Sequence, residues 1–206
     1  MTGAEQCPRC GLPVRRLPDS RWWCTTDGAV AALAEVEEPT AYALLRHVAA
    51  SSFPTWLPWP MPAQWSLAGV GRAGDPQVQA TVSACVAPDP FGGVADLVVV
   101  CEEPGVGLGT RYAGVPGRDV GREISGSPPT TRVSVAGHAT PLWWLGGGPD
   151  RDGFVGEASG RWLWLVAWPA SAGALVTDRL AFVNLHDLSH QIDLIPLTGR
   201  SRRLTG

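Results

Sequence analysis

Cys7-Pro8-Arg9-Cys10-Gly11 and Cys24-Thr25-Thr26-Asp27-Gly28 repeat one pattern: a metal-binding residue, two spacers, a second metal-binding residue and a glycine. Two side chains at this spacing on a tight turn can point at the same metal ion. The glycine allows a positive φ, which turns backbone N–H groups toward the sulfurs. We therefore predict a small zinc ribbon whose four ligands are the three cysteines and Asp27.

The segment between the two turns is typical of a β-hairpin. Residues 14–17 and 21–24 are predicted strands, and Pro18-Asp19-Ser20 between them favours a turn. Such a hairpin brings the two metal-binding turns together. One zinc ion per chain in a site with four protein ligands would be structural, because no position is open for water. The alternative is a degenerate ribbon that has lost its metal.

Composition limits the class of protein. The 206 residues suffice for one sizeable domain and a small appendage, and 45% hydrophobic content is typical of a globular chain. The net charge of −3 argues against nucleic-acid binding. No apolar run is long enough to span a membrane, and Met1–Gln6 lacks the features of an export signal. We therefore expect a cytoplasmic protein whose five cysteines form no disulfide framework.

The domain boundary is predicted near residue 36. Residues 29–38 are expected to be a linker or a frayed helix, which separates a zinc-ribbon-like segment (1–36) from a β-rich α+β domain (37–206). A helix is predicted from Pro39 to before Pro54, because apolar residues recur there at helical spacing. These residues are Ala41, Leu44, Leu45, Val48 and Ala49.

The larger domain is predicted to be a curved, mainly antiparallel sheet with one or two helices, because short Gly- and Pro-rich loops separate its strands. Predicted strands cover residues 77–86, with one solvated face, and 97–101 and 162–168, both interior, followed by 132–136 and 180–185. A short helix is possible after Pro169. The arginine-rich residues 200–203 are predicted to be a solvated tail.

Ten tryptophans suggest either core packing or a recognition surface. Trp162, Trp164 and Trp168 alternate along one predicted strand, so we expect them to be buried. Trp56 and Trp59 lie in a proline-rich extended segment, where a spacing of three places both rings on the same side. We expect that side to face the sheet, although a binding partner is the alternative.

Other motifs are less specific. The Gly105–Tyr112 loop fails the dinucleotide fingerprint at Thr110, but Gly107, Gly109, Arg111 and Tyr112 remain candidates for binding a polar ligand. His186 and His190 have zinc-protease spacing without an evident third ligand, so they are expected to be exposed loop residues. Glu102 and Glu103 could do acid–base chemistry or simply end a strand. Cys85 and Cys101 are expected to be inert core residues.

Several of these motifs occur together in a family that this chain resembles. The Cys-x2-Cys-Gly start, Trp56–Pro60, Gly105–Gly114 and Arg161–Trp164 are similar to a family of uncharacterised actinobacterial proteins with a domain of unknown function. The resemblance implies His-Gly where this chain has Asp27-Gly28, so the fourth ligand is its point of departure. Some relatives carry the label phosphotransacetylase, but no anion-binding motif of that chemistry is evident here.

The sequence thus favours a non-catalytic binding or adaptor protein that uses its Trp/Pro surface or the glycine loop. Its partner would be a protein or a small polar ligand. The alternative is an enzyme of unrecognised type with the Gly105–Tyr112 loop as its site. A deep polar pocket beside that loop would favour the enzyme, and a flat exposed tryptophan patch would favour the adaptor.

Overall fold

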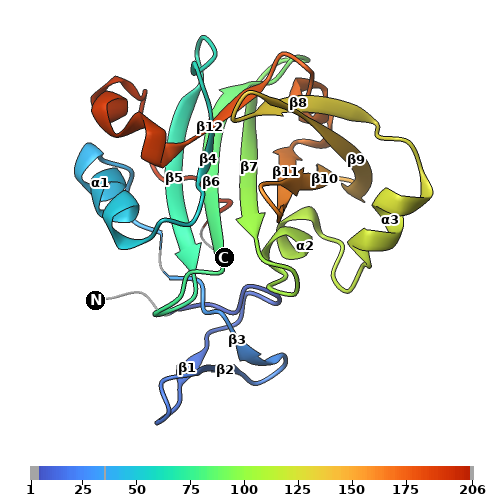
Figure 1. The fold of residues 1–206 in the computed structure, drawn as a ribbon. Helices are drawn as coiled ribbons and strands as arrows, with labels where there is room; N and C mark the ends of the chain where they lie inside the picture. Colours follow the sequence, from blue (N-terminus) through green and yellow to red (C-terminus); the bar gives the residue numbers. More distant parts are fainter. Residues whose placement is uncertain (1–4, 35, 205–206) are drawn as a thin grey trace.

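The computed structural model describes residues 5–34 and 36–204. Residues 1–4, part of the segment used above to exclude an export signal, lie outside this description. A small three-stranded sheet lies beneath one end of a large curved sheet (Figure 1). No helix in the described ranges is long and apolar enough to cross a membrane.

The small sheet contains β1 (Arg15–Arg16), β2 (Trp22–Cys24) and β3 (Gly28–Val30), all antiparallel. The hairpin of β1 and β2 confirms the prediction. The linker or frayed helix expected at residues 29–38 is wrong at its start, because β3 pairs with β2. Leu33 then forms isolated bridges to both Gln6 and Ala73. No sequence pattern indicated this strand, because its residues show no alternation of apolar and polar side chains. The pairing starts at the tight turn before Gly28.

The large sheet has nine strands in the order β4-β12-β8-β9-β10-β11-β7-β6-β5. Neighbours are antiparallel except β12 and β8, so the predicted α+β class with a curved, mainly antiparallel sheet is confirmed. The strands are β4 (Trp56–Pro58), β5 (Ser66–Ala73), β6 (Ala80–Pro88), β7 (Val94–Glu102), β8 (Thr131–Val135), β9 (His138–Gly148), β10 (Arg151–Ala158), β11 (Arg161–Trp168) and β12 (Ala181–Asn184).

The helices are short. They are α1 (Ala41–Ala50), α2 (Leu108–Ala113) and α3 (Val120–Gly126), with 3-10 helices η1 (Ala170–Leu175) and η2 (Leu185–Leu194). The predicted helix before Pro54 is α1, and it begins where the Thr40 side chain accepts a hydrogen bond from the Ala43 N–H. Its buried face is narrower than predicted: Leu44 is buried, whereas Leu45 is 48% exposed.

The two predicted interior strands lie at the centre of the sheet. In β7, Leu97 and Val99 belong to one core cluster, while Val98 and Val100 belong to another. The sheet therefore buries both faces. In β11, Trp164 and Trp168 are 1% and 2% exposed, as predicted, whereas the predicted burial of Trp162 is wrong, because this residue is only half-buried.

The solvated face predicted for residues 77–86 holds for Gln77 and Gln79, which are exposed, and is wrong from Thr81 onward. Thr81 and Ser83 are buried, and their hydroxyls donate to the backbone carbonyls of Pro54 and Trp56. The segment that contains β4 therefore lies across this strand and satisfies its polar groups. Trp56 is 4% exposed and Trp59 packs against the same core, which confirms that both rings face inward.

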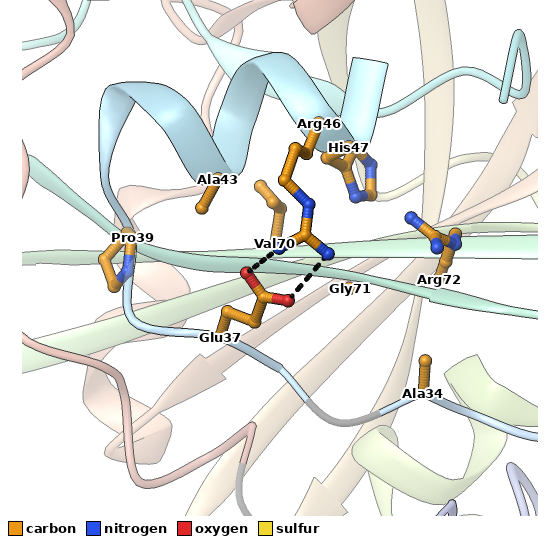
Figure 2. Close-up of a pocket in the computed structure, with 9 residues that line it drawn as sticks. All are labelled: Ala34, Glu37, Pro39, Ala43, Arg46, His47, Val70, Gly71 and Arg72. Atoms are coloured by element: carbon orange, nitrogen blue, oxygen red, sulfur yellow. Dashed lines mark hydrogen bonds and ion pairs between the residues drawn. The ribbon is translucent and has the colours of Figure 1, made fainter. Parts of the chain in front are cut away.

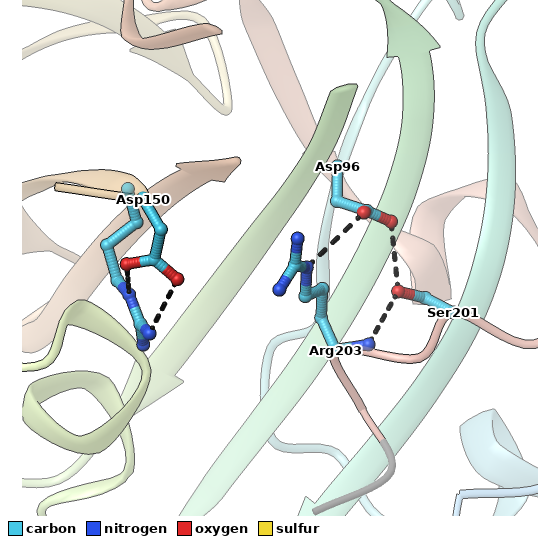
Figure 3. A network of polar contacts seen from close by, with 5 residues as sticks. Asp96, Asp150, Ser201 and Arg203 are labelled. Atoms are coloured by element: carbon cyan, nitrogen blue, oxygen red, sulfur yellow. Dashed lines mark hydrogen bonds and ion pairs between the residues drawn. The ribbon is translucent and has the colours of Figure 1, made fainter. Parts of the chain in front are cut away.

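The predicted solvated tail is also wrong, because the C-terminal segment docks on the sheet. Leu204 is buried, and a Cβ at Gly69 would lie 2.8 Å from its Cδ1 atom, so the glycine in β5 makes room for it. Ser201 Oγ donates to Asp96 Oδ1 at 3.0 Å, and Arg203 Nε lies 3.5 Å from Asp96 Oδ2 (Figure 3). Ser201 and Leu204 are the residues that are buried, but they lie among three arginines, so the sequence did not reveal this docking.

Candidate metal centre and adjoining cavity

The four predicted ligands come together in the ribbon. Their donor atoms all lie within 4.8 Å of one another, close enough to bind a metal ion. Cys7 Sγ is 3.2 Å from Asp27 Oδ2, and Cys10 Sγ is 3.5 Å from Cys24 Sγ. Donors around a tetrahedral zinc ion are separated by about 3.5–4 Å, given zinc–sulfur bonds of about 2.3 Å. The donor set therefore fits such an ion in both chemistry and spacing.

The turns that carry these ligands have the predicted backbone. Gly11 and Gly28 have φ values of +79° and +74°. Thr26 N–H donates to Cys24 Sγ at 3.4 Å. Burial alone would raise the pKa of the Cys24 thiol, but hydrogen bonds from the backbone N–H groups of Asp27 and Thr26, together with those from the Cys10 and Cys7 side chains, lower that pKa. The second turn is thus arranged to stabilise a thiolate.

The ribbon is held on the large sheet by two arginines that cross between them. Arg9 donates from Nη2 to Gly105 O at 2.7 Å and from Nε to Val106 O at 3.3 Å. In the opposite direction, Arg111 of α2 donates to Cys7 O at 3.2 Å. Arg111, predicted as a ligand-binding residue, therefore contacts the backbone of a predicted metal ligand.

A cavity of about 650 Å³ lies where the ribbon, the glycine loop and α3 meet. We call it the ribbon cavity. Cys10 and Asp27 line it from the ribbon, Thr110 from α2 and Val120 from α3. Aromatic rings and further polar groups complete the wall: Trp162, Trp164, Arg9, Glu102, Arg118 and Asp119, with Gly105, Gly107 and Gly121 among the glycines.

The predicted loop residues have different environments around this cavity. Gly107 lines it and has φ +88°, and a Cβ there would lie 2.8 Å from Arg9 Cγ. Gly109 lies beneath Trp164, since its Cβ would come within 2.1 Å of the indole Cδ1. Tyr112 lies in α2, and its side chain is buried in the core. A ligand contact for these residues stays a prediction.

Glu102 is a buried carboxyl group at the wall of the ribbon cavity, and the sequence did not single it out from Glu103. It is 2% exposed, and its oxygens accept from Leu108 N at 2.7 Å and Gly109 N at 3.2 Å. Burial raises its pKa to about 7, although these backbone donors act in the opposite direction. Glu103 instead pairs with Arg161 at 3.0 Å.

This raised pKa predicts that stability falls as pH rises. Below pH ~4.5, Glu102 is protonated in both the folded and the unfolded chain. Between that pH and the folded pKa of about 7, Glu102 ionises in the unfolded chain but stays protonated in the folded chain, so the free energy of unfolding falls as pH rises. The expected loss is about 3 kcal/mol between pH 4.5 and 8. The measurement is urea unfolding of the wild type and Glu102→Gln at each pH. Their difference cancels the pH dependence that both chains share, and a constant difference would refute this assignment.

A second, smaller cavity of about 100 Å³ lies between α1 and β5 (Figure 2). Glu37 pairs with Arg46 at 3.1 Å on its wall, and Arg72 lies opposite. Burial lowers the pKa of His47 to about 4, with the charge of Arg72 adding to the effect, and His47 Nε2 is 2.8 Å from Thr55 Oγ1. The imidazole is therefore neutral at pH 7, and His47 adds no positive charge with which this cavity could bind an anion.

The histidine pair His186 and His190 does not form a metal site in the described part of the chain. His186 and His190 lie in η2, a 3-10 helix with about three residues per turn, so a spacing of four does not align them. His190 is exposed as expected, but His186 is half-buried and its Nε2 contacts Ser51 O, so the expectation of an exposed loop residue is wrong for His186. Cys85 and Cys101 are buried in the core as predicted, and burial raises both pKa values to about 12.

Comparison with known proteins gives a family but no characterised relative. A family model described as "Family of unknown function (DUF6758)" matches residues 1–204. The searches of curated proteins and of solved structures found no match.

Proposed function

The chain belongs to the family of unknown function DUF6758, and we propose from its geometry that it is a zinc-containing binding protein that takes a small ligand in the ribbon cavity. The single observation that carries this proposal is that cavity. Its volume of about 650 Å³ lies within the usual range for small-molecule sites. Indole rings with a few polar groups are also the usual lining of such sites.

The metal is proposed to be zinc, one ion per chain. Three thiolates select a soft or borderline ion, and the spacing of the four donors suits a tetrahedron. The proposed role is structural: Cys7, Cys10, Cys24 and Asp27 would fix the two turns and thereby one wall of the ribbon cavity. We also propose a cytoplasmic location, because thiol ligands need a reducing compartment.

The buried tryptophans support a small ligand over a protein partner. Trp56 and Trp59, the residues expected to form a binding surface in an adaptor, pack inward on the core. The indole rings that line a cavity are Trp162 and Trp164. An adaptor role would therefore need a surface other than the Trp/Pro segment.

An enzyme is the second candidate, and Glu102 is the observation that favours it. A carboxyl group with a pKa of about 7 can donate or accept a proton at neutral pH. It lines the ribbon cavity beside the glycine loop, which is where the sequence placed the site of an enzyme.

The test is native mass spectrometry of the zinc-loaded chain after incubation with a small-molecule extract of the cells that make it. Gly121→Phe places a ring at the cavity wall, where a new Cβ is 3.4 Å from Asp119 Oδ1 and meets no backbone. Gly126→Phe is the matched control on the same helix, with nothing within 4 Å of its Cβ. We expect a bound small molecule that Gly121→Phe loses and Gly126→Phe keeps.

The fate of that molecule separates the two candidates. Recovery of the compound unchanged supports binding alone, whereas a product of altered mass supports the enzyme. Equal retention by both phenylalanine variants would show that the ribbon cavity is not the binding site.

A further inference from the structure

The four metal-binding side chains are unequally exposed. Cys7 and Cys24 are completely buried, whereas Cys10 is exposed and Asp27 is half-buried. Cys10 and Asp27 are also the two that line the ribbon cavity. The Cys10–Asp27 edge of the donor set is therefore part of the cavity wall, and a metal ion held by the four residues is approached from the cavity through that edge.

Asp27 is the donor that an incoming ligand displaces most easily. Thiolates and aromatic nitrogens are preferred zinc ligands, whereas a carboxylate is a harder ligand that also suits magnesium or calcium. Arg9 lines the same cavity, so a displaced carboxylate keeps a counter-charge nearby.

The remaining cavity wall indicates what kind of molecule carries the incoming donor. The half-buried Trp162 provides aromatic surface, the nearly buried Trp164 lies behind it in the wall, and Val120 and Pro116 add apolar contacts. Aromatic rings stack favourably on indoles. A planar aromatic ligand therefore suits the cavity better than a highly charged one.

We propose that the ribbon metal is a ligand-accepting centre, which binds a small nitrogen-containing aromatic molecule through a neutral ring nitrogen in exchange for Asp27. This inference rests on the proposed zinc site and adds one exchangeable position, that of Asp27, to its structural role. In the exchange, the bond from the ion to the Asp27 oxygen breaks and a bond to the ring nitrogen forms. The three thiolates stay bound, no proton is transferred, and the Asp27 carboxylate stays in the cavity that Arg9 also lines.

The test uses the full chain loaded with Co²⁺ in place of zinc, with imidazole as the probe. Cobalt bound by cysteine shows a thiolate-to-metal charge-transfer band, and its d–d bands report which atoms coordinate it. We expect the d–d bands to change saturably with imidazole while the charge-transfer band persists. If the metal site itself is absent, no charge-transfer band develops on adding Co²⁺, so failure of the proposed zinc site is recognised separately.

Three variants define the exchanged ligand and the route. Asp27→Cys should bind Co²⁺ but lose the imidazole response, because a fourth thiolate replaces the exchangeable carboxylate. Gly121→Phe should weaken the response at least about tenfold by narrowing the cavity, and Gly126→Phe should leave it unchanged. Loss of the charge-transfer band with imidazole would mean that the probe removes the metal. That result, unchanged d–d bands, or an equal response in Gly121→Phe would each overturn the inference.

Discussion

Trp164→Ala should lower the free energy of unfolding by about 3–5 kcal/mol, the usual cost of truncating a large buried aromatic side chain. Trp164 is 1% exposed in β11, which lies between β10 and β7. Its indole also packs directly on the backbone of α2 at Gly109, so the substitution would remove this contact as well. The measurement is urea unfolding followed by circular dichroism.

Trp144→Ala is the matched control for this truncation. Trp144 lies in the same sheet but is 54% exposed, and its Nε1 donates to Asp152 at 3.0 Å. Losing one exposed hydrogen bond should cost about 1 kcal/mol or less. Equal losses in the two variants would be inconsistent with a well-packed core around Trp164.

Cys10→Ser should remove the metal from the ribbon without unfolding the large sheet. Cys10 is the exposed member of the four, so the substitution changes a ligand and leaves no core cavity. Metal binding contributes directly to the folding of small ribbons. We therefore expect hydrogen exchange to lose its protection in residues 5–30, while β7 and β11 remain protected by their own core.

The same experiment examines the proposed division between residues 1–36 and 37–206. Loss of protection should stop before Leu33, which is 2% exposed and belongs to the core of the large sheet. Cys85→Ala, a buried cysteine remote from the metal ligands in sequence, is the control and should keep the metal. Simultaneous loss of protection in the ribbon and in β7 would mean that the two parts unfold as one unit.

The clustering of the four candidate metal ligands was predictable because its information is local. Each pair of ligands lies on one tight turn followed by a glycine, and one short hairpin joins the turns. The interior strands β7 and β11 were predictable for a similar reason, since a continuous apolar run needs both faces covered.

Strands β9 and β10 were not predicted, because close packing of their backbones requires glycine. A Cβ at Gly156 would lie 2.3 Å from Pro141 O, and one at Gly153 would lie 2.9 Å from Gly146 O. Glycine is usually a sign of a loop, so the residues that permit this packing concealed the strands.

The ribbon cavity could not be predicted for a different reason. Its walls come from both turns of the ribbon, the end of β7, the glycine loop with α2, the start of α3 with the loop before it, and the start of β11. Only the tertiary fold brings these segments together. Burial of Glu102 depends on α2, because its carboxylate accepts hydrogen bonds from the first N–H groups of that helix. No sequence pattern at Glu102-Glu103 distinguishes the buried carboxylate from its neighbour.

The most direct test of the zinc site is the metal content of the full chain, purified without added zinc and measured by inductively coupled plasma mass spectrometry. We predict close to one equivalent of zinc per chain, retained through dialysis and strongly reduced in Cys10→Ser. A wild-type chain that is fully folded, contains no metal and takes up none when zinc is added would contradict the account.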